Sequence, residues 1–378
     1  MQLRLIRCYS TKFSAGEYVA IQPLKQTTTS KTYLTKLQPG QNYSVTTGHF
    51  KHNDIIGSHS RSVIYVHKGS TKDTKYVVSK PTTEEYVNLI KRDAQPIYPM
   101  DAAAIVNLAD LHIDYPNLTP EGKLSQPPLQ FLEAGTGHGS LALQIVKAIH
   151  PANCFVKQLG MDVRGAVLHS IDCNPKHSKT GSKTVKEFKN GMYANDVEFH
   201  LSESPTTWLQ NESQSWVELS RDKDEQQLEF EDKNAFLSGV FLDMGGFEKQ
   251  LPECAKHLKL DAPLVIFCPS VTQVMDAVRI VDETPEMNLQ FVKTVQLLDG
   301  AGGGLKEWDT RKAVIRATGE AGWVCRPKVG IRVCGGGFVV IFRKGATKMV
   351  ETVIEKVIYE PRRETNQAVV KKWWEFWK

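Results

Sequence analysis

The first part of the chain alternates short apolar segments with polar turns. Between residues 14 and 80, segments rich in Val, Ile, Tyr and Thr are separated by turns such as LQPGQN and HKGSTKD. Short β-branched and aromatic segments bounded by Gly, Asn, Asp and Ser predict strands rather than helices. We therefore expect a small all-β module, a compact barrel, with strands at EYVAIQPL, KTYLTKL, QNYSVTT, SVIYVHK and KYVVSK.

Beyond residue 80 the pattern changes to alternating strands and helices. PTTEEYVNLI is predicted to be a helix capped by Thr82 or Thr83, because Glu84 and Glu85 favour the positive end of a helix. Strands are then expected at PLQFLEA, GAVLHSID, SGVFLDM, PLVIFCP, LQFVKTVQLL and GGGFVVIFRK. Helices are expected at MDAAAIVNLADL, SLALQIVKAIH, KTVKEFKNGMYAN, FEKQLPECAKHLK and SVTQVMDAVRIVDE. This alternation favours an α/β fold with a doubly wound, mostly parallel sheet and a C-terminal antiparallel addition.

Three stretches interrupt this alternation. Residues 117–128 are turn-rich, and residues 154–165 lengthen the passage to the second strand of the sheet. Residues 202–233 are polar and acidic, so they are predicted to form a mobile loop. The chain ends in KKWWEFWK, whose aromatic side chains suit stacking on RNA and docking of a terminal helix on its own domain equally well.

The composition is that of a globular protein. Of 378 residues, 41% are hydrophobic and 24% charged, and no window approaches the ~18 uninterrupted apolar residues of a membrane span. The net charge is +5, and residues 11–100 alone hold twelve Lys and Arg against six Asp and Glu, a local charge of +6. This excess suits an anionic partner such as RNA, and it equally fits a solvated surface.

Two features bear on the cellular compartment. The seven cysteines form no C-x-x-C pair and no metal-spaced His/Cys cluster, which predicts reduced thiols without structural zinc or disulfides. The N-terminal MQLRLIRCYSTKF is basic, contains hydroxyl residues and has no acid before Glu17, as is typical of mitochondrial transit peptides. RCYS resembles a matrix-protease site, so we predict a leader over residues 1–9 and a location in the matrix. The alternative is a frayed, mildly basic N-terminus.

Residues 131–143, FLEAGTGHGSLAL, join a predicted strand to a predicted helix through three glycines. Such a turn presents backbone N–H groups and the positive end of a helix to a ligand. Gly135, Gly137 and Gly139 let the chain turn sharply and let a ligand lie against bare backbone. A dinucleotide fingerprint requires its third glycine where Ser140 stands, so this spacing fits dinucleotides poorly.

Two acidic residues favour S-adenosylmethionine instead. Glu133 precedes the first glycine by two residues, where folds that bind this cofactor place an acid near its positively charged methionine end. Asp172 ends the next predicted strand and is positioned to accept hydrogen bonds from a ribose diol. Each signal has a simpler interpretation, because glycine turns are common and a strand-terminal Asp often caps a helix. Together they predict cofactor binding.

The order of several segments resembles the catalytic-type subunit of the tRNA adenine-N1 methyltransferases, which modify the T-loop adenosine. The resemblance covers about residues 14–345 and includes GHFKHNDIIG, KPTTEEYVNLIKRDAQPIYPMDAAAIV, FLEAGTGHGSLAL, VFLDMGGFEKQLPECAKHLK, VIFCPSVTQVMDAV and LKEWDTR. It implies a Rossmann-like methyltransferase domain preceded by a small β-barrel-like domain. The implied domains are a leader at 1–9, a β domain at 14–80, a methyltransferase domain at 81–345 and an extension at 346–378.

The resemblance also implies the roles of individual residues. Asp243 matches the catalytic carboxylate and Tyr98 the aromatic residue that contacts the base. Three more residues fall in segments that line the family's pocket: Gln95, Asp101 and Gln273. From the sequence alone, Asp101 is also the expected cap of the helix AAAIVNLAD. The implied cofactor-binding residues are Gln95, Glu133, Gly135, Thr136, Gly137, His138, Gly139, Ser140, Asp172 and Asp243.

The substrate half of the site departs from the family pattern. Asp243 is followed by Met-Gly-Gly-Phe instead of a segment ending in Pro-Trp, and Met100 stands where Lys is usual. The late His-containing element is replaced by the glycine run 335–337. Two functions therefore follow from the sequence. One is S-adenosylmethionine-dependent methylation of N1 of adenosine in mitochondrial tRNA, or rRNA, by an oligomeric enzyme. The other is an RNA-binding or assembly factor of this fold with little turnover.

Overall fold

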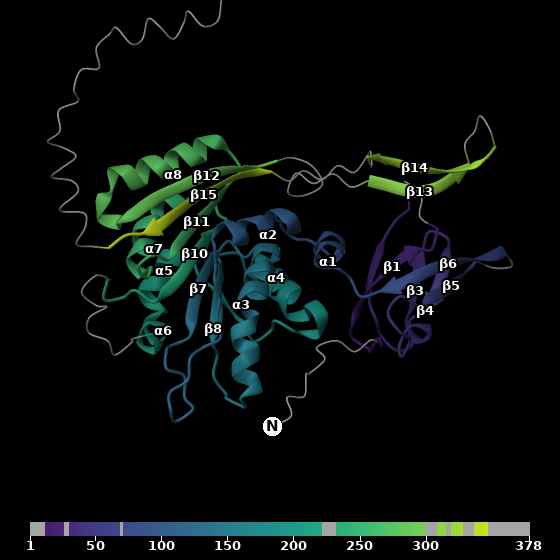
Figure 1. Cartoon of the computed structure of the whole chain (residues 1–378), viewed down its shortest axis with the longest axis horizontal. Helices are drawn as coiled ribbons and strands as arrows, with labels where there is room; N and C mark the ends of the chain where they lie inside the picture. Colours follow the sequence, from purple (N-terminus) through teal and green to yellow (C-terminus); the bar gives the residue numbers. More distant parts are fainter. Residues whose placement is uncertain are drawn as a thin grey trace, which may run out of the picture.

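The computed structural model describes residues 12–25, 30–68, 71–220, 232–298, 308–314, 319–327 and 336–346. It contains a six-stranded sheet near the N-terminus, a larger seven-stranded sheet and a two-stranded hairpin (Figure 1). The predicted leader, residues 1–9, and the KKWWEFWK tail lie outside the described residues.

The N-terminal sheet is antiparallel, with strand order β2-β1-β6-β5-β4-β3. Its strands are β1 Tyr18–Pro23, β2 Tyr33–Lys36, β3 Asn42–Val45, β4 Gly48–Lys51, β5 Val63–Lys68 and β6 Thr71–Ser79. Side chains bring the two edge strands together: the N–H of Thr46 donates to the hydroxyl of Tyr33 over 3.2 Å. The hydroxyl of Tyr43 donates to the carbonyl of Leu34 over 3.5 Å. The predicted all-β module is confirmed, although the short strand β4 was not foreseen.

Two short helices connect the sheets. Helix α1, Thr83–Leu89, begins with a capping box. Thr82 Oγ1 accepts from the N–H of Glu85 over 3.1 Å, and the side-chain carboxylate of Glu85 accepts from the N–H of Thr82. This confirms Thr82 as the cap. Helix α2, Pro99–Leu108, begins earlier than predicted because proline suits a first helical position. Tyr98 is its N-terminal cap residue, so the prediction that Asp101 caps this helix is wrong.

The large sheet has the order β12-β15-β11-β10-β7-β8-β9. Five neighbouring strands are parallel, and β15 runs antiparallel to both β11 and β12, as predicted. The strands are β7 Leu129–Ala134, β8 Ala166–Asp172, β9 Val197–Leu201, β10 Leu237–Leu242, β11 Pro263–Cys268, β12 Leu289–Leu297 and β15 Gly337–Lys344. Strands β13, Trp308–Val314, and β14, Ala321–Pro327, form the separate hairpin, which the sequence pattern did not predict.

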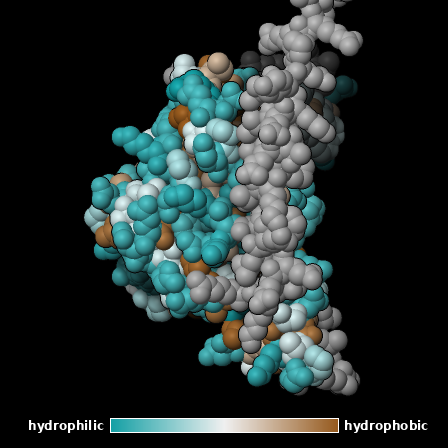
Figure 2. Space-filling view, turned by 90° about the vertical axis from the view of Figure 1, so that its left-hand side faces the viewer, coloured by the Kyte–Doolittle hydropathy of each residue, from teal (hydrophilic) through white to brown (hydrophobic). Residues whose placement is uncertain are grey.

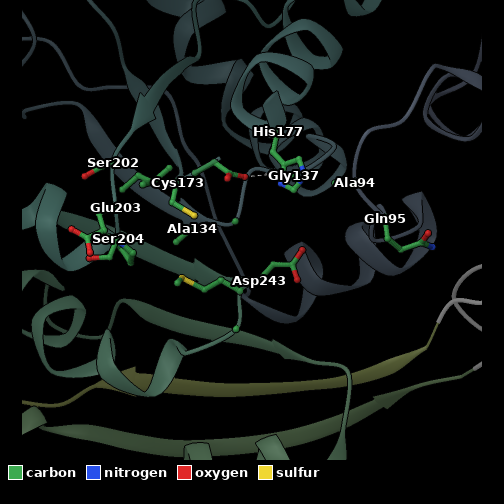
Figure 3. Close-up of a pocket in the computed structure, with 16 residues that line it drawn as sticks. Ala94, Gln95, Ala134, Gly137, Cys173, His177, Ser202, Glu203, Ser204 and Asp243 are labelled. Carbon is green, nitrogen blue, oxygen red and sulfur yellow. Dashed lines mark hydrogen bonds between the residues drawn. The ribbon is translucent and has the colours of Figure 1, made fainter. Parts of the chain in front are cut away.

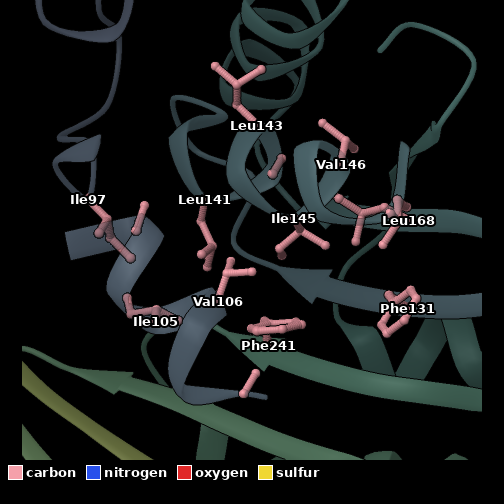
Figure 4. Packing of buried hydrophobic residues seen from close by; sticks show 14 of the residues in the cluster. Ile97, Ile105, Val106, Phe131, Leu141, Leu143, Ile145, Val146, Leu168 and Phe241 are labelled. Carbon is pink, nitrogen blue, oxygen red and sulfur yellow. The ribbon is translucent and has the colours of Figure 1, made fainter. Parts of the chain in front are cut away.

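Helices cover both faces of the large sheet. Helix α2 shares one buried apolar cluster with α3, Ser140–Gln158, and α4, Pro175–Glu187. Figure 4 shows residues of α2 and α3 packed around Phe131 and Phe241. The other face is covered by α5 Pro205–Asn211, α6 Gln214–Leu219, α7 Leu251–His257 and α8 Val271–Glu283. Helix α4 begins eight residues before its predicted start, since the side chain of Asn174 caps it and Pro175 opens it.

The segment 202–233 was predicted to be a mobile loop, and for residues 205–219 that prediction is wrong. These residues form α5 and α6, and Trp208 is only 1% exposed. Its ring packs against His169 and His200, at centroid distances of 4.9 and 4.7 Å. Trp208, with the buried Leu209 and Val217, therefore anchors a stretch that is mostly polar.

Replacing Trp208 with Ala is expected to lower the free energy of unfolding by about 3–5 kcal/mol, because it empties a large buried volume. Urea unfolding followed by circular dichroism measures this loss. Trp323→Ala is the matched control, since Trp323 is 71% exposed on the hairpin. Equal effects of the two substitutions would contradict the packing described for α5.

The N-terminal sheet is attached to the end of α4 by polar contacts and to α1 by an aromatic contact. The carboxylate of Glu187 accepts from the hydroxyl of Tyr18 over 2.9 Å and from Nζ of Lys36 over 2.8 Å. The ring of Tyr18 also meets Tyr86 edge-on at a centroid distance of 5.2 Å. These contacts hold the N-terminal sheet, the predicted β module, beside α4, which leads away from the carboxyl edge of the large sheet.

The surface visible in Figure 2, on the side of α6 to α8, is mostly hydrophilic with small, separate hydrophobic spots. No helix in the described part of the chain is long and apolar enough to cross a membrane. Scattered exposed apolar residues of this kind are usual for globular proteins.

Candidate cofactor-binding and active site

A cleft of about 340 Å³ opens at the carboxyl ends of four parallel strands, β7, β8, β9 and β10 (Figure 3). The chain starts at β7, proceeds to one side through β8 and β9, and returns to the other side at β10. Ligands bind at such a reversal of strand order in open α/β sheets. The wall is formed by Ala94, Gln95, Ala134, Gly135, Gly137, Ile171, Asp172, Cys173, His177, Ser202, Glu203, Ser204, Pro205, Asp243, Met244 and Gly245.

The three glycines of the loop have different roles. Gly135 has φ +97°, and a Cβ there would lie 1.9 Å from the carbonyl oxygen of Asp243. Gly139 has φ +83°, and its Cβ would lie 2.8 Å from the carbonyl oxygen of Gly181 on α4. At Gly137 a Cβ would meet only Ala94 Cβ at 3.8 Å and the loop's own Gly135 oxygen. Gly135 and Gly139 therefore permit close packing, whereas Gly137 presents bare backbone to the cleft.

Asp172 fixes the loop and faces the cleft. Its Oδ2 accepts from the N–H of Gly137 over 2.8 Å, drawn as a dashed line in Figure 3, and its Oδ1 accepts from the N–H of Asn174 over 2.8 Å. A carboxylate has about four acceptor positions, so two remain after these bonds. Its place in the wall suits the predicted contact with a ribose diol.

The charge of the cleft discriminates between cofactors. Asp172, Glu203 and Asp243 line it, and its described lining residues include no Lys or Arg. Three carboxylates attract a cationic ligand and repel a pyrophosphate. Burial raises the pKa of Asp243 from 3.8 to about 7. A cation bound nearby would favour its ionised form. The residues therefore fit S-adenosylmethionine, whose sulfonium is positive, and they do not fit a dinucleotide.

Glu133 lies behind the cleft instead of in its wall. Its side chain is 0% exposed, and its Oε2 accepts from the hydroxyl of Ser170 over 2.5 Å. Oε1 has no well-formed hydrogen bond among the described residues. Burial raises the pKa of Glu133 from 4.5 to about 8; Ser170 opposes the shift and Asp243 adds to it. The buried carboxyl is thus held largely protonated at neutral pH.

The raised pKa of Glu133 predicts a dependence of stability on pH. Between pH 4.5 and about 8 the folded state binds the proton that the unfolded state has released, so stability falls as pH rises. The contribution of protonated Glu133 to the free energy of unfolding is complete below pH 4.5 and lost above about 8. Protonated Asp243 contributes in the same direction, and its contribution is lost above about pH 7. Glu133→Gln cannot ionise, so urea unfolding at pH 5.5, 7 and 8.5 should show a shallower decline. Between pH 5.5 and 8.5 the free energy of unfolding of wild type should fall by on the order of a few kcal/mol more than that of Glu133→Gln. Identical pH profiles for wild type and Glu133→Gln would contradict the buried protonated state.

Other predicted loop residues are also buried. Thr136, 3% exposed, hydrogen-bonds through its hydroxyl to Ser170 Oγ over 2.7 Å. His138 is 2% exposed, and burial lowers the pKa of its ring to about 4. Ser140 begins α3 and is 3% exposed. These three side chains support the loop from behind, and a direct contact with cofactor stays a prediction for each of them.

The predicted substrate residues lie at different places. Gln95 is in the cleft wall, and its Nε2 donates to the hydroxyl of Tyr98 over 3.4 Å, so Tyr98 stands beside the cleft at the start of α2. Asp101 is buried, and its Oδ2 accepts from the N–H of Gly336 over 3.4 Å. Gln273 serves the capping box of α8, where its Oε1 accepts from the N–H of Ser270 over 3.2 Å, and it does not line the cleft.

The segment after Asp243 combines an open turn with a buried anchor. A Cβ at Gly245 or Gly246 would meet nothing within 4 Å, and Gly246 has φ +74°. Phe247, by contrast, is 0% exposed and packs in the core beside α7. Phe247 therefore anchors the segment in the core, while the two glycines lie at a turn where added side chains would meet open space.

Several wall residues were not predicted from the sequence. Cys173 and His177 follow β8, and Ser202, Glu203 and Ser204 follow β9 (Figure 3). The signal that would have revealed the second group is strand β9, VEFHL, because parallel strands present their carboxyl ends to one edge. Since that strand was not predicted, the acidic segment after it was assigned to a loop.

Comparisons with known proteins agree with this geometry. No family model matches the chain. The tRNA (adenine(58)-N(1))-methyltransferases TrmI of two Thermus thermophilus strains are 28% identical over 267 residues, covering 71% of this chain and 79% of each relative. The crystal structure of tRNA (m1A58) methyltransferase TrmI from Aquifex aeolicus matches with a TM-score of 0.52 and 21% identity, over 88% of this chain and 98% of that one. A SAM-dependent O-methyltransferase from Thermotoga maritima matches with a TM-score of 0.57 and 12% identity, over 89% and 95%.

The sheet order is that of the Rossmann-like fold found in methyltransferases that use S-adenosylmethionine, and the acidic cleft fits that cofactor. Within that class, the sequence match confirms the resemblance to the tRNA (adenine-N1)-methyltransferase family, to which the TrmI proteins belong. The two solved structures support the fold alone. The predicted fold class and cofactor are thereby confirmed, while the individual site residues stay predictions.

Proposed function

We propose that this chain transfers a methyl group from S-adenosylmethionine to N1 of an adenosine in the T loop of mitochondrial tRNA. The observation that carries the proposal is the position of Asp243. Its carboxylate lies at the carboxyl end of β10, in the wall of a cleft shared with Gln95, in a chain related to TrmI.

The chemistry requires placement more than a strong base. When bound, S-adenosylmethionine supplies an electrophilic methyl group. The lone pair of adenine N1 is already a nucleophile, so the protein must expose N1 by extruding the base and hold it in line. Asp243 accepts a hydrogen bond from the exocyclic amine and stabilises the positive charge that develops on the purine. Tyr98 contacts the base, and Gly137 and Asp172 hold the cofactor.

The ionisation of Asp243 limits this role. Burial raises its pKa to about 7, so at neutral pH part of the population is protonated and a poorer acceptor. The cationic cofactor and the developing charge on the base both favour the ionised form. The value of kcat/KM, which reports the free enzyme, is accordingly expected to rise as pH increases through about 7, and kcat to rise at a lower pH.

The cellular and molecular setting is part of the proposal. The basic, acid-free N-terminal sequence supports import into the mitochondrial matrix, with cleavage after Tyr9. The TrmI relatives support tRNA over rRNA as the substrate. The family resemblance implies a homo- or hetero-oligomer, tetrameric in the family's usual form.

A second function is favoured by one observation. Gly245 and Gly246 follow Asp243 closely, and a Cβ at either would meet no atom within 4 Å. Glycines restrict the backbone least, and a loosely held catalytic group loses much of its rate. A chain that binds cofactor and RNA but turns over slowly would act as an RNA-binding or assembly factor.

Incorporation of labelled methyl groups separates the two functions. Purified protein is incubated with methyl-labelled S-adenosylmethionine and either unmodified mitochondrial tRNA or mitochondrial rRNA, and binding of each ligand is measured in parallel. The enzyme proposal expects repeated turnover on tRNA and little on rRNA. Tight binding of both ligands with less than one methyl group transferred per protein would establish the binding factor instead.

A further inference from the structure

Helix α4 carries a stripe of lysines on one face. Within Pro175–Glu187 the lysines are Lys176, Lys179, Lys183 and Lys186, and all four are exposed. At 100° per residue they fall within an arc of about 80°. The buried residues Gly181, Thr184 and Val185 occupy the opposite side of the helix.

This arrangement is unfavourable for the isolated helix. The spacings of three, four and three residues place each lysine beside the next, and like charges at such spacings repel. Lys176 is also the second helical residue, at the positive end of the helix dipole, where a cation is disfavoured. The only acid in the helix, Glu187, is engaged at its other end by Tyr18 and Lys36.

The stripe extends beyond the helix at both ends. At the cleft end, Lys176 pairs with Asp93 over 3.0 Å, next to exposed Lys91 and Arg92. At the other end, Lys36 brings the N-terminal sheet against Glu187. These seven basic side chains face two acids, Asp93 and Glu187, a net charge of +5. We call Lys91, Arg92, Lys176, Lys179, Lys183, Lys186 and Lys36 the basic track.

The basic track runs from the cofactor cleft to the β module. His177, at the start of α4, is in the cleft wall, and Gly181 packs against the glycine loop. The end of α4 touches the N-terminal sheet through Glu187. The exposed side of α4 is thus about one helix diameter, roughly 10 Å, from the loop that would hold the cofactor. Figure 1 shows α4 between the large sheet and the β module.

We propose that the basic track binds the phosphate backbone of the RNA and guides it from the β module to the cleft. The inference rests on the proposed function for the identity of the RNA. A polyanion whose charges follow the helix relieves the repulsion along the stripe and releases bound counterions. Lysines suit phosphates as point charges without base specificity. The track therefore positions the substrate, while sequence or shape is read elsewhere.

The test compares two triple variants with the same loss of charge. Lys179→Gln/Lys183→Gln/Lys186→Gln removes the middle of the track, and Lys233→Gln/Lys256→Gln/Arg279→Gln removes three exposed cations outside it, before β10, on α7 and on α8. Binding of unmodified tRNA is measured from 50 to 300 mM salt. The track variant is expected to bind about tenfold more weakly at low salt. The slope of log K against log salt should be shallower by about 2. The control should stay within twofold of wild type.

Methylation and vesicle binding complete the test. With the track variant, KM for tRNA should rise while kcat and the affinity for S-adenosylmethionine stay near wild type. Unchanged tRNA affinity and salt slope would overturn the inference, even if methylation is observed. Weakened RNA binding in a protein that transfers no methyl group would support the track and refute the enzyme. Loss of binding to phosphatidylglycerol vesicles without loss of tRNA binding would show that the track serves a lipid surface.

Discussion

Asp243→Ala is expected to lower the rate of methyl transfer at saturating substrates by at least about 100-fold. The substitution removes the carboxylate that stabilises the charge on the purine, and losses of a single preorganised electrostatic group are of this size. Binding of S-adenosylmethionine should weaken by less than about tenfold, because Asp172, Glu203 and the Gly137 backbone remain. Single-turnover methylation and calorimetric titration of the cofactor measure the two quantities.

Two further variants test the charge of Asp243 and provide a control. Asp243→Asn keeps the shape and one acceptor oxygen but carries no negative charge to stabilise the charge on the purine, so it should be nearly as inactive as Asp243→Ala. Asp276→Ala, on the exposed side of α8, should retain wild-type activity. Full activity in Asp243→Ala would remove Asp243 from the mechanism.

Gly135→Ala is expected to destabilise the fold strongly, whereas Gly137→Ala should keep most of its stability and lose cofactor affinity. At Gly135 the new Cβ would lie 1.9 Å from the Asp243 carbonyl at a φ of +97°, so β7 and the Asp243 segment must separate. The expected loss is about 3–5 kcal/mol of unfolding free energy. At Gly137, with φ +49°, the strain costs about 1 kcal/mol, and the methyl group covers the bare backbone.

Thermal unfolding with and without S-adenosylmethionine distinguishes the two glycine variants. Gly135→Ala should unfold at a much lower temperature under both conditions. Gly137→Ala should unfold near the wild-type temperature, yet gain less stability from the cofactor. Gly16→Ala, at a turn with φ +88° and no neighbour within 4 Å, reports the cost of backbone strain alone. Equal unfolding temperatures for Gly135→Ala and Gly16→Ala would contradict the close approach of Gly135 to the carbonyl group of Asp243.

Local patterns predicted the elements whose apolar residues are consecutive. Strand β7, the glycine loop and α3 follow directly from FLEAGTGHGSLAL, and Thr82 was predictable as a cap because Glu85 stands three residues later. Strand β9 was missed because VEFHL is short and three of its residues are only partly buried. Helices α5 and α6 were missed because their stability depends on Trp208, whose burial arises from contacts with β8 and β9.

The site was predictable where a residue ends a predicted strand. Asp172 was found in this way, whereas Asp243 was assigned through the family resemblance, and both line the cleft. The burial of Glu133 was not predictable, because it depends on Ser170 from the neighbouring strand and on packing by α3. Asp101 was assigned to a cap from composition, whereas its partner, Gly336, lies 235 residues away along the chain. Contacts of this range leave no local signal.

Mapping the methylated atom tests the central claim most directly. Unmodified mitochondrial tRNA is incubated with the protein and S-adenosylmethionine, then digested to nucleosides for mass spectrometry and copied by reverse transcriptase. We expect N1-methyladenosine and a reverse-transcription stop at one T-loop adenosine, because a methyl group on N1 blocks base pairing. Both signals should be absent with Asp243→Ala. Methyl groups at another base or atom, or none despite binding of both ligands, would contradict the central claim.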